Sequence, residues 1–214
     1  PAFCYGDEPN VPETLNQLTA THNALHAVSP DIWTEIAFHV ENPESYTMMK
    51  TVDVSHFKRF LKDADFKAVK PYAKLLIASN VGHSRVDFGL REWYAAKELG
   101  TDGCITYAYT GSHVDIYYGL DAREDDYTMA PPRLDGTLAT TATWENIREG
   151  IDDFRYSLAL EAITKDPAAT AERKTSATAL LKAAVDAGGM SDHAAILDRS
   201  VTWRTEVQKL LAGQ

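Results

Sequence analysis

The chain has 214 residues, of which 44% are hydrophobic and 24% are charged, the proportions of an ordinary globular protein with a sizeable core. A formal net charge of −10 disfavours nucleic acid as a partner, because an acidic surface repels the phosphate backbone. No run of about 18 apolar residues predicts a membrane span, and the two cysteines are too few for a disulfide framework or a zinc site.

The chain begins in what the sequence predicts to be a buried strand. Residues 3–5 are apolar and lead directly into Gly-Asp-Glu-Pro at positions 6–9. Residues 12–28 predict a helix, because apolar side chains and His22 recur there at spacings of three and four. Since the first residue is Pro1 and not Met, we expect the chain to be the remainder of a longer domain.

Strands and helices alternate over the next eighty residues. The predicted strands are residues 31–40, 51–54, 74–79 and 104–109, and the predicted helices are residues 56–64 and 88–99, the latter ending at Gly100. Such alternation favours βαβ units in a parallel sheet. Without a dinucleotide-binding fingerprint, the pattern indicates the later strands of a (β/α)8 barrel of the TIM type, although an open doubly wound sheet is an alternative.

The remainder of the chain is a long loop followed by helices. Aspartate, proline and glycine crowd residues 111–140, and loops of that length are usually functional. Residues 144–161 then predict a helix with an apolar stripe, residues 175–187 a second helix, and residues 191–211 a third with Ser191 as its N-cap. We therefore expect residues 1–140 to be the C-terminal part of a barrel catalytic domain, and residues 141–214 to be a helical segment packed on it.

The strongest chemical signal is the pair Asp7 and Glu8 directly after the first strand. In a barrel, side chains at the carboxyl ends of strands face the substrate. Repulsion between adjacent carboxyl groups raises the pKa of one of them, which favours an acid beside an ionised partner, as glycoside cleavage requires. The alternative is that Asp7 caps the next helix and Glu8 is a solvated residue of its first turn.

Other polar and aromatic residues near strand ends are candidates for the wall of a pocket. Tyrosines after the last strand could stack on sugar rings, and neighbouring aspartates could accept hydrogen bonds from hydroxyl groups. Glu35, Asp53, His56 and His83 also follow or end predicted strands, although lone histidines are more often structural. Nothing in the histidine spacing defines a metal site, so no metal or other cofactor is predicted. The predicted substrate-binding residues are Tyr5, His39, Asn80, Arg85, Tyr107, Tyr109 and Tyr117.

Two stretches resemble the family 123 glycoside hydrolases, which are β-N-acetylgalactosaminidases and their relatives. Residues 5–9 (Tyr-Gly-Asp-Glu-Pro) resemble the strand-end motif of that family. Residues 136–138 and 144–156 (WENIREGIDDFRY) resemble the region of the helix that closes its catalytic domain. Residues 85–89 and 100–103 are similar to two late-barrel stretches, so the matches span roughly residues 3–160.

The resemblance implies an exo-acting hydrolase of N-acetyl-hexosaminides that works by substrate-assisted catalysis. Glu8 would be the general acid and base, and Asp7 would orient the acetamido N–H group. Arg148, Glu149 and Asp152 would form a structural ion network in the closing helix. A carbohydrate substrate, the remaining N-terminal part of the barrel or another chain, and a secreted or periplasmic location are also implied, with no nucleic-acid or membrane partner.

Two alternatives stay open at the level of sequence. A conventional retaining glycosidase would use Glu8 as the acid and a carboxylate such as Asp115 as the nucleophile. A non-catalytic barrel would instead bind a glycan or a protein partner through its tyrosine-rich loop.

Overall fold

The computed structural model describes residues 2–7, 12–38, 47–58, 63–79, 81–106 and 133–213, and only the backbone at residues 2–7, 12, 57, 58 and 79. The chain forms two compact units. The sheet unit comprises residues 1–81 and 95–105, and the helical unit comprises residues 82–94 and 106–214. In the parts of the chain so described, no helix is long and apolar enough to cross a membrane.

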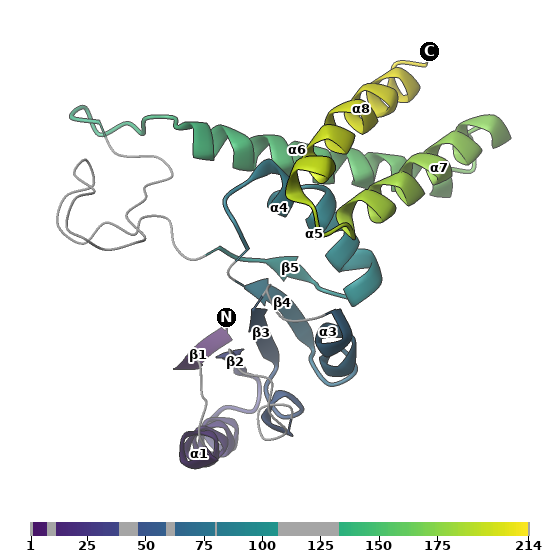
Figure 1. The fold of residues 1–214 in the computed structure, drawn as a ribbon. Coiled ribbons are helices and arrows are strands. Elements are labelled where there is room, and N and C mark those ends of the chain that lie inside the picture. Colours follow the sequence, from purple (N-terminus) through teal and green to yellow (C-terminus); the bar gives the residue numbers. More distant parts are fainter. Residues whose placement is uncertain are drawn as a thin grey trace. The chain divides into compact units, whose positions relative to one another are not determined.

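The sheet unit contains five parallel strands whose spatial order follows the chain (Figure 1). They are β1 (Ala2–Asp7), β2 (Trp33–Phe38), β3 (Val54–Lys58), β4 (Leu75–Ser79) and β5 (Gly103–Cys104). The helices of this unit are α1 (Pro12–Val28), α3 (Asp63–Val69) and the π-helix η1 (Ala95–Leu99). Because the order of the strands in the described ranges never reverses, these strands show no switch point of a doubly wound fold. The predicted α/β class is confirmed, and the order is consistent with part of a barrel.

Buried and more exposed side chains alternate along the strands, so the sheet has one buried face and one more open face. Thr34, Ile36 and Phe38 on β2 are fully buried, as are Ser55 on β3 and Leu76 and Ala78 on β4. Helix α1 lies against this face, because Nδ1 of His22 is 3.0 Å from the hydroxyl oxygen of Thr34. The residues between them, such as Trp33 and Glu35, belong to the opposite face, since successive side chains of a strand point to opposite sides.

Strand β3 is the main correction to the predicted elements. The sequence predicts a strand at residues 51–54 and a helix at residues 56–64, whereas the structure has β3 at Val54–Lys58 and α3 at Asp63–Val69. β3 pairs with β2 on one side and with β4 on the other. Pairing on both sides outweighs the local helical spacing, which is how tertiary context commonly overrides a short pattern.

Several of the remaining elements agree with the sequence, but of the strand predicted at residues 104–109 the structure has only β5 at Gly103–Cys104, and residues 105 and 106 are not part of it. Helix α1 begins and ends at the predicted residues, and β4 lies inside the predicted range. The predicted helix at residues 88–99 is present as α5 followed by η1, and Gly100 ends it with a φ of 75°. A positive φ is the usual reason for glycine at that position.

The helical unit is built from α4 (Arg85–Phe88), α5 (Leu90–Tyr94), α6 (Ala142–Lys165), α7 (Ala171–Gly188) and α8 (His193–Leu211). Its core includes Leu90, Trp93, Leu160, Ile196 and Val207. The N-cap of α8 is Asp192 and not the predicted Ser191, because the carboxylate of Asp192 accepts hydrogen bonds from the amides of Ala194 and Ala195. A carboxylate at this position also interacts favourably with the helix dipole.

Helix α6 buries only part of the face that its apolar pattern predicts, since of that stripe Ile147 is buried and Phe154 packs against the core. Trp144, Ile151 and Leu158 are 37 to 47% exposed, whereas the buried positions are Ile147, Gly150, Asp153, Ser157 and Leu160. A Cβ atom at Gly150 would lie 2.6 Å from the carbonyl oxygen of Arg85. Small residues therefore let the neighbouring helix α4 approach closely, and this contact decides which face is buried.

Candidate functional site

The open face of the sheet carries a hollow of about 720 Å³. It lies within the sheet unit and is lined by Asp31, Trp33, Glu35, Val54, His56, Leu75, Ile77 and Ile105. Its volume lies within the range of ligand sites, roughly 300 to 1,000 Å³. Trp33 and Ile105 are 42% and 44% exposed, although a parallel sheet is normally covered on both faces. The hollow is therefore a part of the described sheet unit that could receive a ligand or a further chain.

A carboxylate and an imidazole lie close together in this hollow. Nε2 of His56 is 3.2 Å from a carboxylate oxygen of Glu35, and the two side chains are 12% and 22% exposed. Burial lowers the pKa of His56, and the negative charge of Glu35 partly offsets that effect. His56 is therefore favoured in its neutral form near neutral pH, in which one ring nitrogen donates and the other accepts hydrogen bonds.

The strand register aligns the predicted acid Asp7 with this pair. Asp7 pairs with Ala37, Ala37 with His56, and His56 with Ile77, so their backbones form one row across the sheet. The pairing of β1 with β2 shifts by one residue between Cys4 and Gly6, as at a β-bulge. Without that shift Gly6, and not Asp7, would occupy the row of His56. Such bulges are common beside active sites, where they redirect a strand.

The other predicted site residues have varied outcomes. Glu8, His39, Asn80, Tyr107, Tyr109 and Tyr117 lie outside the described residues, as does Asp115, and Tyr5 is described only as backbone in the shifted part of β1. Arg85 is described in full and lies in the helical unit, on α4. His83, another strand-end candidate, has its Nε2 atom 2.8 Å from the hydroxyl of Thr106.

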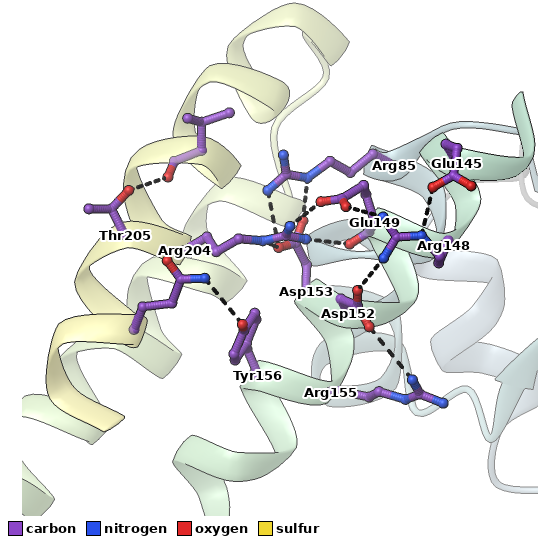
Figure 2. A network of polar contacts seen from close by, with 12 residues as sticks. Arg85, Glu145, Arg148, Glu149, Asp152, Asp153, Arg155, Tyr156, Arg204 and Thr205 are labelled. Carbon is purple, nitrogen blue, oxygen red and sulfur yellow. Dashed lines mark hydrogen bonds and ion pairs between the residues drawn. The ribbon is translucent and has the colours of Figure 1, made fainter. Parts of the chain in front are cut away.

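Arg85 is held by a buried carboxylate (Figure 2). Its Nε donates to Asp153 at 2.6 Å and a terminal nitrogen donates to the same carboxylate at 3.2 Å. Arg204 of α8 donates to Asp153 at 2.6 Å and also pairs with Glu149. Asp153 is fully buried, and its two arginine partners are 14% and 16% exposed. This arrangement ties α4, α6 and α8 together, so it supports a structural role for Arg85.

The ion network predicted for the closing helix is confirmed by its contacts (Figure 2). Arg148 lies within 3.0 Å of carboxylate oxygens of Glu145, Glu149 and Asp152. The hydrogen bond from Arg204, opposed by partial burial, holds the pKa of Glu149 below its ordinary value. Each of these carboxylates pairs with Arg148, and Glu149 also pairs with Arg204, which fits a structural network.

Asp53 lies at the end of the sheet where the strands begin, and its contacts there are structural. It precedes β3, and one carboxylate oxygen accepts hydrogen bonds from the amide and hydroxyl of Thr34 at 2.8 and 3.1 Å. Burial opposes its ionisation, but hydrogen bonds from Lys74 and Thr34 hold the pKa of Asp53 below its ordinary value. Asp53 therefore joins the starts of three strands, and it does not belong to the carboxyl-end group in which the sequence places it.

Sequence reasoning missed that Trp33 and Asp31 line the hollow and that Glu35 and His56 are partners. The sequence did contain a signal, because successive strand residues point to opposite faces of a sheet. Positions 33 and 35 alternate with the buried Thr34 and Ile36 and so belong to the other face. No three or more histidine, cysteine, aspartate or glutamate side chains of the described ranges form a group that could hold a metal ion. The chemistry available in the hollow is therefore that of carboxylates, an imidazole and an indole ring.

Comparison with known proteins shows the fold. No family model matches the sequence, and no curated protein matches it at a significant level. Among solved structures, the chain is similar to a family 123 glycoside hydrolase from Clostridium perfringens, which was described in a study of glycolipid glycan hydrolysis. The TM-score is 0.64 at 11% sequence identity, and the match covers 98% of this chain and 41% of that protein. The resemblance seen in the sequence is thus confirmed at the level of the fold.

Proposed function

We propose that the protein is a glycoside hydrolase that acts from the non-reducing end of N-acetyl-hexosaminides, with its chemistry at Asp7 and Glu8. The observation that carries the proposal is the register of β1, which aligns Asp7 with the row of the hollow that contains His56. The fold likeness to a family 123 glycoside hydrolase supports the same class of reaction. A hollow that combines an exposed indole ring with carboxylates suits a sugar, which offers both C–H faces and hydroxyl groups.

The proposed reaction is substrate-assisted. Glu8 donates a proton to the glycosidic oxygen while the substrate's acetamido oxygen bonds to the anomeric carbon and the glycosidic bond breaks. Asp7 accepts a hydrogen bond from the acetamido N–H and stabilises the positive charge of the resulting oxazoline. Glu8 then removes a proton from water. The oxygen of that water attacks the anomeric carbon and opens the oxazoline ring, which restores the acetamido group. The scheme uses the substrate and two carboxyl groups, and it requires no cofactor.

The architecture that we propose for the active protein is a (β/α)8 barrel of which this chain supplies five strands. The strictly sequential parallel order supports this, since it is the order of barrel strands. Residues 1–140 would belong to the barrel, and residues 141–214 would form the helical segment packed on it. Its other strands would come from further N-terminal sequence or from another chain.

The test is turnover of an aryl N-acetyl-β-galactosaminide by the full-length protein and by its Glu8→Gln and Asp7→Asn variants. Loss of a general acid typically lowers the rate by roughly 10² to 10⁴-fold, and we expect a loss in that range for Glu8→Gln. Glu13→Gln is the matched control, because Glu13 is an exposed acid in the first turn of α1. Equal turnover by native protein and Glu8→Gln would remove Glu8 from the mechanism.

Two further outcomes separate the proposal from its alternatives. A stable covalent adduct with a 2-fluoro sugar would indicate a protein nucleophile and hence a conventional retaining mechanism. Undiminished sugar binding without turnover in native protein and in both variants would indicate a non-catalytic glycan-binding protein.

A further inference from the structure

Trp33 lines the hollow and keeps much of its surface exposed. Its exposed fraction is 42%, whereas Trp93 and Trp203, in the core of the helical unit, are 2% and 5% exposed. An indole ring is a large apolar surface, so leaving it open to water forgoes the free energy of its burial. At the wall of a cavity, such a ring offers a flat face on which the C–H groups of a sugar ring can pack.

Two carboxylates line the hollow beside this ring. Asp31 lies two residues before Trp33, and Glu35 lies two residues after it on the same face of β2. Residues two apart in a strand are about 6.7 Å apart. Burial lowers the pKa of His56, so near neutral pH the imidazole does not cancel the charge of Glu35. The indole face therefore lies in a negative potential.

No described lysine or arginine lines the hollow to offset this charge. Lys74 directly precedes Leu75, which does line it, but the ammonium group of Lys74 pairs with Asp53. The same carboxylate accepts hydrogen bonds from Thr34, whose side chain belongs to the buried face of the sheet. The positive charge at these strand starts is thus bound to the acid of the buried face.

We propose that the hollow is a subsite for a sugar ring without negative charge, in which Trp33 stacks on the ring while Asp31 and Glu35 accept hydrogen bonds from its hydroxyl groups and repel acidic sugars. This inference rests on the proposed function for its class of ligand, a sugar, and adds the residues that determine specificity. A unit charge about 5 Å from a carboxylate changes affinity by roughly 4-fold in bulk water, and by more in a less polar cavity.

The experiment is an NMR titration of the full-length protein with galactose, galacturonic acid and galactosamine near neutral pH. These sugars share one ring configuration and differ in charge. Galactose should shift the indole N–H signal of Trp33, assigned from Trp33→Phe, and leave that of Trp144 unchanged. Trp144 is the matched control, because it is 37% exposed but lies in the helical unit.

The ring signals of His56, assigned from His56→Gln, give the affinities. Galacturonic acid should bind at least about 4-fold more weakly than galactose, and galactosamine at least as tightly as galactose. Glu35→Gln and Asp31→Asn should each narrow the difference between galactose and its acid. Glu13→Gln should not, because α1 lies on the opposite face of the sheet.

Two further variants test the stacking contact. Trp33→Ala should lower the affinity for galactose by roughly 10-fold, as loss of an aromatic anchor commonly does. Trp144→Ala, the control on α6, should leave that affinity unchanged.

The inference is overturned if galacturonic acid binds as tightly as galactose, or if no sugar shifts the Trp33 signal. Either result can accompany loss of turnover in Glu8→Gln, in which case the proposed function stands without this subsite. The expected order of affinities without any turnover of the aryl N-acetyl-β-galactosaminide overturns the proposed function instead, so the two failures are distinguishable.

Discussion

The buried carboxylate of Asp153 permits the sharpest stability prediction. Asp153→Asn keeps the shape of the side chain and removes its charge, leaving the guanidinium groups of Arg85 and Arg204 with 14% and 16% exposure and no shared anion. The new amide N–H group also faces donors, because both arginines donate to this position. Breaking a buried ion pair by removing one partner costs about 3 to 5 kcal/mol. Since Asn retains one acceptor, we expect a loss of about 3 kcal/mol.

The matched control is the adjacent residue on the same helix. Asp152→Asn removes the same charge from α6, but the side chain of Asp152 is 34% exposed and its partners are the exposed arginines Arg148 and Arg155. Exposed ion pairs contribute little to stability. Asp152→Asn should therefore cost much less than the buried substitution.

Urea unfolding followed by tryptophan fluorescence measures both losses. The chain has four tryptophans, of which Trp93, Trp144 and Trp203 lie in the helical unit, so the signal reports chiefly on that unit. Similar free energies of unfolding for the two variants would refute the reasoning. They would show that Asp153 is not the anion that holds α4, α6 and α8 together.

Two further predictions concern packing and pH. Alanine normally stabilises a helix interior by about 1 kcal/mol over glycine, but Gly188→Ala should destabilise the helical unit, because its Cβ would lie 2.1 Å from the carbonyl oxygen of Leu90. Ser176→Ala, at an exposed position of the same helix, is the control in urea unfolding. Burial and then the charge of His26 lower the pKa of His22 from its ordinary value of 6.5, so the folded chain binds fewer protons than the unfolded chain just below that pH. The melting temperature should therefore fall as the pH drops through 6.5, and His22→Gln should reduce this dependence; a melting temperature that rises in that interval would contradict the assignment.

The sequence predicted the elements whose local pattern and long-range pairing agree. Helix α1 and strand β4 are examples, because a helical spacing of apolar residues and an unbroken apolar run are each decisive alone. The predicted bounds of strand β3 were wrong because its pairing with β2 and β4 involves residues far apart in the sequence, which a local pattern of about ten residues does not contain. The apolar stripe of α6 was wrong in part for a related reason, since glycine and aspartate at its buried face carry no hydrophobic signal.

The candidate site was predictable only in part. Glu35 and His56 were among the strand-end candidates, but their partnership depends on the diagonal across β2 and β3, which the misplaced third strand concealed. The alignment of Asp7 with their row depends on a one-residue shift in β1. No periodicity reveals such a shift in a strand of six residues. Arg85 was assigned to substrate because it follows a predicted strand, and its partner Asp153, 68 positions along the chain, could not be recognised from the sequence.

The carboxylates of the described residues lie in two different kinds of environment. Asp153 and Asp53 are almost completely buried, and each is paired with arginine or lysine and with further donors, so their charges hold elements together. Glu35 and Asp31 line a hollow that no described arginine or lysine lines, and the polar partner of Glu35 there is His56, whose pKa is lowered by burial. Uncompensated negative charge around a cavity costs stability, and proteins retain such arrangements mainly where function requires them. The same distribution predicts that a ligand of the hollow carries hydrogen-bond donors or a developing positive charge, as the transition state of glycoside cleavage does.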